Sequence, residues 1–166
     1  MVSQLKVNEI VKQSGSNLTI GGSGDNIVLG SGATTAFGKI GQVIQGSKTA
    51  QFETSSTSFV DGGLSATITP STTSSKILIM CSTSAIHTST TSAGGETLIK
   101  FYDGTTAIGD EYQVAKTRQD GSYNQEGGGG GTAMFLYSPS TTSATTINVY
   151  VRINTGSNGR ICQNGH

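Results

Sequence analysis

The stretch from Thr146 to Ile153 alternates strictly between polar and apolar side chains. A period of two matches a β-strand, in which successive side chains point to opposite faces of a sheet, and it does not match an amphipathic helix. One face of this strand is therefore expected to lie in a core. The side chains expected inside are Ile147, Val149, Val151 and Ile153.

A second apolar run, residues 76–81, shows no such alternation. Apolar side chains on both faces are typical of a central strand covered on each side, so this run predicts a strand with Ile77 and Ile79 in the core. Cys81 lies in the same run and is expected to act as a small buried hydrophobe. A disulfide between Cys81 and Cys162 is disfavoured, because cytoplasmic proteins rarely keep disulfides.

The chain contains 24 glycines, and serine and threonine are about as frequent. Thr favours strands whereas Gly and Ser favour turns, so the mixture predicts many short strands joined by tight loops. Pro-Ser-Thr-Thr-Ser at 70–74 recurs at 139–143, and each proline ends a preceding strand. Residues 39–166 are therefore predicted to form an all-β, antiparallel, jelly-roll-like β-sandwich, or knob. The candidate strands are 39–46, 48–53, 57–60, 64–69, 76–86, 96–102, 131–137 and 145–153.

Residues 119–131 end in five consecutive glycines, Gly127 to Gly131. Glycine is the most flexible residue, so the segment is predicted to be a mobile surface loop that folding does not need. The residues from Tyr112 to Asn124 combine tyrosine with small polar and charged side chains, which suits an adaptable recognition surface. A solvated loop without a ligand is the alternative. The candidate surface-contact residues are Tyr112, Lys116, Arg118, Asp120, Tyr123 and Asn124.

Residues 1–38 are predicted to form a separate anchor or shaft segment. Three units, 15–21, 24–30 and 32–38, each begin and end with glycine around a short strand-like stretch. Units this short bury apolar side chains only against neighbours, so we expect copies of the chain to supply the core. A homotrimer would also pair the strand edges. The candidate oligomerisation residues are Leu18, Ile20, Ile27, Val28, Leu29 and Phe37.

The charges of the chain balance to a net charge of zero, without a cluster of Lys or Arg. Nucleic acid and anionic membranes are therefore not expected as partners. No apolar stretch approaches the ~20 residues that a membrane span needs, and the N-terminus lacks the apolar region of a signal peptide. We expect a soluble protein made in the cytoplasm.

No motif of known chemistry is complete. Gly21–Leu29 is similar to one calcium-binding nonapeptide, but Asn26 stands where aspartate is expected, and neither flanking unit repeats the double glycine. His87 and His166 lie far apart in the sequence, and neither a nucleophile elbow nor a phosphate-binding loop occurs. A polysaccharide depolymerase would need paired carboxylates in a groove. The sequence predicts a non-enzymatic protein without catalytic residues, metal or cofactor.

Several strand and turn strings run through most of the chain: Leu5–Asn8, Lys39–Gln45, Thr57–Phe59, Leu64–Ser71, Ser74–Ile79 and Ser138–Arg152. They resemble a family of small tail-fibre and other virion structural proteins of tailed bacteriophages. The resemblance implies a virion component with no catalytic residues. Together with the repeat, it favours a tail-fibre-like homotrimer that binds other virion proteins through its N-terminal segment and contacts a host-surface glycan or protein.

Two points keep alternatives open. A fibre that reaches a receptor normally needs a longer shaft, so a capsid decoration or head-fibre protein that binds and stabilises the shell is the alternative. Members of the resembled family also finish with a further apolar strand, whereas this chain stops at Gly159–His166. Either the sandwich is one strand short or a partner completes it.

Overall fold

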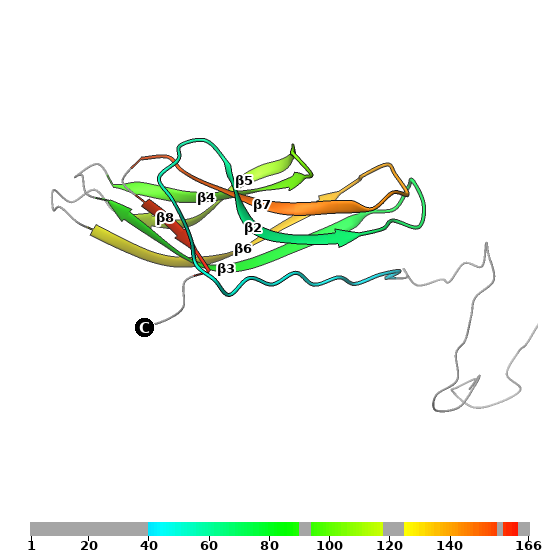
Figure 1. The fold of residues 1–166 in the computed structure, drawn as a ribbon, viewed down its shortest axis with the longest axis horizontal. Coiled ribbons are helices and arrows are strands. Elements are labelled where there is room, and N and C mark those ends of the chain that lie inside the picture. Colours follow the sequence, from blue (N-terminus) through cyan, green and yellow to red (C-terminus); the bar gives the residue numbers. More distant parts are fainter. Residues whose placement is uncertain (1–39, 90–93, 118–124, 156–157, 163–166) are drawn as a thin grey trace, which may run out of the picture. The chain divides into compact units, whose positions relative to one another are not determined.

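The computed structural model describes residues 40–89, 94–117, 125–155 and 158–162. Within these ranges every regular element is a β-strand, and the strands form two antiparallel sheets (Figure 1). One sheet has the order β1-β8-β3-β6 and is called the β3–β6 sheet; the other, β2-β7-β4-β5, is called the β4–β7 sheet. The strands are β1 (Phe52–Thr54), β2 (Val60–Ile68), β3 (Ile77–Ser89), β4 (Gly95–Asp103), β5 (Thr106–Thr117), β6 (Gln125–Tyr137), β7 (Thr145–Ile153) and β8 (Asn158–Ile161).

The two sheets pack around one core, which confirms the predicted antiparallel sandwich. Every connection between consecutive strands crosses from one sheet to the other except the β4–β5 hairpin, which is typical of a jelly roll. The sandwich unit begins at Ile40. The predicted anchor segment, residues 1–38, lies outside the described residues.

The alternation in β7 places every second side chain in the core, from Thr145 to Ile153. Ile77 and Ile79 of β3 face the same interior, so every residue predicted to lie in the core is buried. Phe101 of β4 is the largest fully buried side chain. Phe101 lies opposite Val149 in the sheet register, and the two strands together form the centre of the core.

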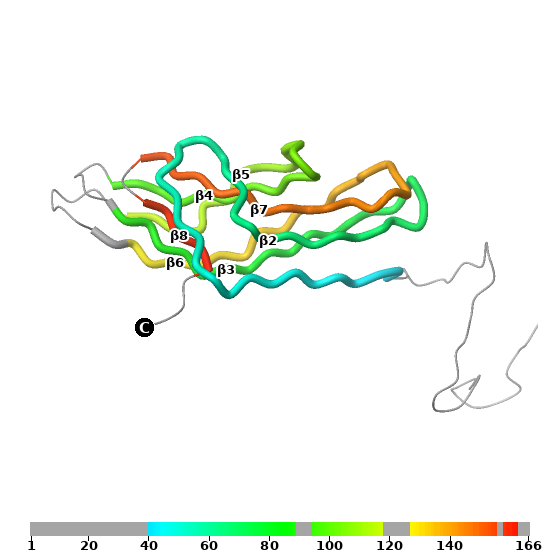
Figure 2. The backbone as a smooth tube through the Cα atoms, in the orientation of Figure 1, coloured from blue at the N-terminus to red at the C-terminus, as the bar shows by residue number. Residues whose placement is uncertain are grey.

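The predicted strands 39–46 and 48–53 are wrong in extent. Residues 40–50, called the arm, run extended along the sandwich without joining a sheet (Figure 2). Side-chain and packing contacts hold the arm: the Thr69 amide donates to Gln42 Oε1 at 3.2 Å, and a Cβ at Gly46 would collide with the Ser65 carbonyl. Most arm side chains stay exposed. Sheet pairing begins only at Phe52.

The predicted strand 57–60 is wrong except for its last residue, because β2 begins at Val60 and runs through the predicted strand 64–69 to Ile68, with a β-bulge in between. The register with β7 shifts between Asp61 and Leu64. Gly63 adopts a φ of 71°, a conformation that favours glycine, and its amide donates to Asp61 Oδ1 at 2.8 Å. The turn-like Gly62-Gly63 pair therefore bends a strand and does not end one.

The glycine run is not a mobile loop, which corrects the prediction for residues 127–131. Gly127 to Gly131 lie within β6, whose register with β3 is continuous from Ile77 opposite Tyr137 to Ser89 opposite Gln125. Glycine is required on the inward side, since a Cβ at Gly127 would collide with the Lys116 carbonyl and one at Gly129 would lie 2.6 Å from the Val114 carbonyl. The absent side chains let β6 approach the backbone of β5.

The C-terminal segment supplies the strand that the sequence left in doubt. β8 inserts between β1 and β3, with Ile161 opposite both Phe52 and Ala85. Ile161 is fully buried. The β3–β6 sheet therefore gains its fourth strand from this chain, and neither of the two outcomes considered for the last sheet position, a missing strand or a strand from a partner, holds.

Candidate functional site

The outer face of the β3–β6 sheet carries large exposed apolar side chains in directly opposed pairs. Leu78 lies opposite Leu136 and Met80 opposite Met134 in the antiparallel register. Their side chains are 57%, 59%, 64% and 51% exposed, in that order. Cross-strand pairs on one face contact each other, so these residues form one contiguous surface, called the apolar patch.

The same face continues beyond the apolar patch with small side chains. The next register rows pair Ser82 with Thr132 and Ser84 with Gly130. A Cβ at Gly128, one row further, would meet nothing within 4 Å. None of these positions carries a charge. The first ion pair on this sheet lies across β1 and β8, where Arg160 Nε is 2.9 Å from Glu53 Oε2.

The outer face of the β4–β7 sheet has different chemistry. Tyr102 and Tyr150 stack with ring centroids 3.9 Å apart, and Phe59 lies 6.2 Å from Tyr102. The guanidinium carbon of Arg152 is 5.2 Å from the Phe59 ring centroid, within the range of a cation–π interaction. Arg152 also pairs with Glu111 at 2.6 Å. We call Phe59, Tyr102, Tyr150 and Arg152 the aromatic cluster.

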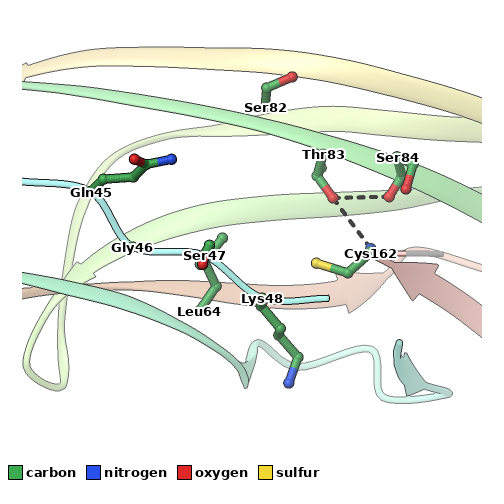
Figure 3. Close-up of a pocket in the computed structure, with 9 residues that line it drawn as sticks. All are labelled: Gln45, Gly46, Ser47, Lys48, Leu64, Ser82, Thr83, Ser84 and Cys162. Carbon is green, nitrogen blue, oxygen red and sulfur yellow. Dashed lines mark hydrogen bonds between the residues drawn. The ribbon is translucent and has the colours of Figure 1, made fainter. Parts of the chain in front are cut away.

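A shallow depression lies between the arm and β3 (Figure 3). The Cys162 amide donates to the Ser84 carbonyl at 3.0 Å and to Thr83 Oγ1 at 3.4 Å, and Thr83 Oγ1 donates to the Ser84 carbonyl at 2.9 Å. The lining holds hydroxyl groups, one amide side chain, one thiol and one ammonium group, without a carboxylate or imidazole for general acid–base chemistry. The lining residues are Gln45, Gly46, Ser47, Lys48, Leu64, Ser82, Thr83, Ser84 and Cys162.

His87 is the only histidine among the described residues, and it is fully buried. Thr97 Oγ1 donates to the Ile86 carbonyl at 3.3 Å, so its oxygen accepts the bond from His87 Nδ1 at 3.2 Å. Nε2 then has no hydrogen-bond partner. Burial lowers the pKa of His87, and the neighbouring Thr155 carbonyl and Glu96 carboxylate only partly offset this effect. Because its imidazole is fully buried, His87 cannot contact a substrate in this conformation.

Both cysteines are free. Burial raises the pKa of the Cys81 thiol, and the neighbouring Cys162 raises it further. A raised pKa keeps the thiol protonated at neutral pH, and the thiolate is the reactive form. Cys81 therefore serves packing, as the sequence predicts. Among the described residues, no three His, Cys, Asp or Glu side chains lie close enough together to hold a metal ion.

Two of the predicted surface-contact residues belong to β5 and not to a loop. Tyr112 turns partly inward: its hydroxyl donates to the Met134 carbonyl at 2.8 Å, and its ring lies 5.7 Å from that of Phe101. Lys116 is exposed and pairs with Glu96 at 3.0 Å. The other predicted contact residues, Arg118, Asp120, Tyr123 and Asn124, lie outside the described residues, as do the candidate oligomerisation residues Leu18, Ile20, Ile27, Val28, Leu29 and Phe37.

Sequence reasoning missed the apolar patch and the aromatic cluster. The signal for the patch is present in residues 76–81, which are apolar on both faces, but that pattern predicts a strand covered on each side. That interpretation is wrong for Leu78 and Met80, because the described residues form two layers and none of them makes a further layer over the outer face of β3. For the aromatic cluster, the alternation of β7 marks Tyr150 and Arg152 as outward residues, but only the register places Tyr102 beside them.

Comparison of the chain with protein-family models, with curated proteins and with solved structures finds no match. The part of the chain that the structure describes contains no helix long and apolar enough to cross a membrane. The surfaces of the sandwich and the resemblance of the sequence strings are therefore the features that bear on function.

Proposed function

We propose that this chain is a non-enzymatic structural protein of a tailed-phage virion, a tail-fibre-like subunit that assembles as an oligomer and contacts a surface. The observation that carries the proposal is the contrast between the two outer faces of the sandwich. One face is apolar around Met80 and Met134, and the other is aromatic and charged around Tyr150 and Arg152. A subunit that assembles on one side and binds outward on the other needs two such faces.

The apolar face supports assembly. Soluble monomers rarely expose contiguous apolar side chains, and such patches are typical of protein interfaces. Leu78 and Leu136 lie directly opposite each other and are both more than half exposed, so burying their apolar surface in an interface would be energetically favourable. An exposed apolar face is compatible with the predicted homotrimer, in which residues 1–38 would bind other virion proteins.

The aromatic cluster supports surface contact. Tyrosine and arginine are enriched in recognition surfaces, because an aromatic ring supplies rigid contact area and a guanidinium supplies directed hydrogen bonds. Here the Tyr102–Tyr150 stack and the Arg152–Glu111 ion pair fix the side chains before a partner arrives. A host-surface glycan or protein is the partner class that suits a fibre tip with this face.

The alternative is a capsid decoration or head-fibre protein that binds and stabilises the shell. The same two faces would serve it, with the apolar side toward the shell. The location of the protein on the particle separates the two functions.

Immunogold labelling of intact virions with an antibody against the sandwich tests the proposal. We expect gold at the tail or its fibres. Gold distributed over the head would support the decoration function instead. A protein missing from purified virions by both labelling and mass spectrometry would contradict both functions. Release of reducing ends from host polysaccharide by the purified protein would contradict the non-enzymatic assignment.

A further inference from the structure

The apolar patch lies where the chain has other unpartnered apolar groups. The patch occupies the first residues of β3 and the last residues of β6. The 69–76 connection joins the end of β2 to the start of β3, so both strand ends lie at one end of the sandwich. The arm begins at this end too, because Gln42 is bonded to the Thr69 amide. In the arm, Ile40 and Val43 are 79% and 80% exposed.

Residues 1–39 join the sandwich at Ile40, at the same end. The proposed function has copies of the chain associate through residues 15–38. Each sandwich would then be tethered to the others at the end on which its apolar patch lies. A tether of this kind raises the effective concentration of one patch near another. The position of the patch therefore favours a second copy as its partner over an unrelated protein.

The chemistry of the face also favours a second copy. The four patch residues carry no charge, so burying them removes no ion from water. The charged neighbour is Lys76, which directly precedes β3 and donates from Nζ to Ser138 Oγ at 2.6 Å. The adjoining rows, Ser82–Thr132 and Ser84–Gly130, add only small side chains, and Gly128 adds none. Such a surface lets another backbone approach closely. Methionine, present as Met80 and Met134, adapts its shape to an apolar neighbour.

From these observations we infer that copies of this chain pack against one another through the outer face of β3 and β6, with Leu78, Met80, Met134 and Leu136 at the centre of the contact. The inference rests on the proposed assembly and names its surface within the sandwich. The face of the β4–β7 sheet, with the aromatic cluster, then points away from the contact, since the two outer faces lie on opposite sides of the core.

Sedimentation velocity of the full chain over a range of micromolar concentrations tests the inference. The wild-type chain should associate. Met80→Lys should raise the dissociation constant by more than about tenfold, because the charge must leave water to enter the contact. Gln113→Lys is the matched control: it adds the same charge at an exposed position of β5, in the other sheet, and should leave association unchanged.

A second variant controls for the case in which Met80→Lys does not fold. Leu78→Thr combined with Leu136→Thr places threonines opposite each other, a pairing that strands tolerate well, and removes apolar area from the contact without adding charge. This variant should also associate more weakly than wild type, while its circular dichroism and cooperative melting stay those of a folded sandwich.

Three outcomes would overturn the inference. One is a wild-type chain that stays monomeric throughout the concentration range. Another is unchanged association in both folded patch variants, which would place assembly in residues 1–38 alone and leave the fibre proposal standing. The third is an equal loss in Gln113→Lys, which would make the effect one of net charge. None of these outcomes decides whether the protein is on the virion, which the labelling experiment measures separately.

Discussion

The buried imidazole of His87 links protonation to folding. Its Nε2 has no hydrogen-bond partner, and Gly95 leaves no space beside it, since a Cβ there would collide with Nε2. Protonation would place a charge in this closed site. The pKa of His87 is therefore lowered in the folded state, with burial as the main cause.

The sign of the resulting pH dependence follows from where protons bind. Below about pH 6.5 the unfolded chain protonates His87 while the folded chain does not, so the unfolded state binds more protons. The free energy of unfolding should fall as pH drops below this value, by at most about 1.4 kcal/mol per pH unit, until the lowered folded-state pKa is passed.

Urea unfolding at a series of pH values between neutrality and the carboxylate range measures this dependence. His87→Gln removes the titrating group at that position while keeping a polar side chain, and it should flatten the curve in this window. His166 is present in both proteins, so the difference between them isolates His87. An equal slope in both proteins would show that another group controls acid stability.

At the scale of elements, β6 shows why five glycines form a strand. Gly127 and Gly129 face β5 at distances that exclude a side chain, whereas a Cβ at Gly128 would point into open space. Pairing with β3 supplies the ladder hydrogen bonds. The close approach of β5 and β6 closes one side of the sandwich.

This arrangement predicts opposite outcomes for two adjacent glycines. Gly127→Ala should destabilise the sandwich by about 1–3 kcal/mol, because the new methyl group forces the backbone of β5 away. Gly128→Ala should be neutral or stabilise it by up to about 1 kcal/mol, since it lowers the entropy of the unfolded chain at no steric cost. Thermal melting of the two variants measures the difference. Equal stabilities of the two variants would contradict the inference that Gly127 points toward β5 and Gly128 points away from it.

The same elements show how far the sequence predicts the fold. The sequence predicts both β7 and its inward residues, because one face of this strand is buried and the other is not. The difference in burial therefore shows in the sequence as an alternation of apolar and polar residues. β5 was missed because its pairing with β4 shifts register between Thr97 and Leu98 and again between Lys100 and Phe101. The first shift leaves one extra residue in β5 and moves its inward positions by one, and the second leaves two extra residues, so the period of two is interrupted along β5. The second half of β6 agrees with the predicted strand 131–137, but its glycine-rich first half is missed because close packing, not local preference, selects glycine there.

The candidate surfaces were less predictable than the core. An outward apolar residue and an inward one look alike in the sequence, so Leu78 could not be told from Ile77 without the register and the number of layers. The aromatic cluster brings Phe59, Tyr102 and Tyr150 together from three separate segments. The spacing of these residues along the chain carries no sign that they meet. The pairing of β4 with β7 brings Tyr102 beside Tyr150, and Phe59 reaches them from the segment before β2.

At the scale of the whole molecule, the sandwich holds its own stabilising contacts. The core cluster and every described strand pairing lie between Phe52 and Cys162. β8 is part of this unit, because Ile161 is buried between the sheets. Because this core and these pairings form among residues 52–162, we expect folding of the sandwich and association through residues 1–38 to be separable.

Deleting residues 1–38 should therefore leave a folded sandwich that associates more weakly than the full chain. Its melting temperature should stay within about 4 °C of the wild-type value, the shift that ~1 kcal/mol produces in a domain of this size. Light scattering at matched concentrations should show partial dissociation, because the apolar patch remains while Leu18, Ile27, Phe37 and their neighbours are lost. Met80→Lys in the full chain is the complementary control, since it alters the patch and keeps the segment.

A truncated protein that melts without cooperativity would show that the contacts of the sandwich are insufficient to fold it. One that associates as tightly as the full chain would show that the repeats at 15–38 do not hold the copies together.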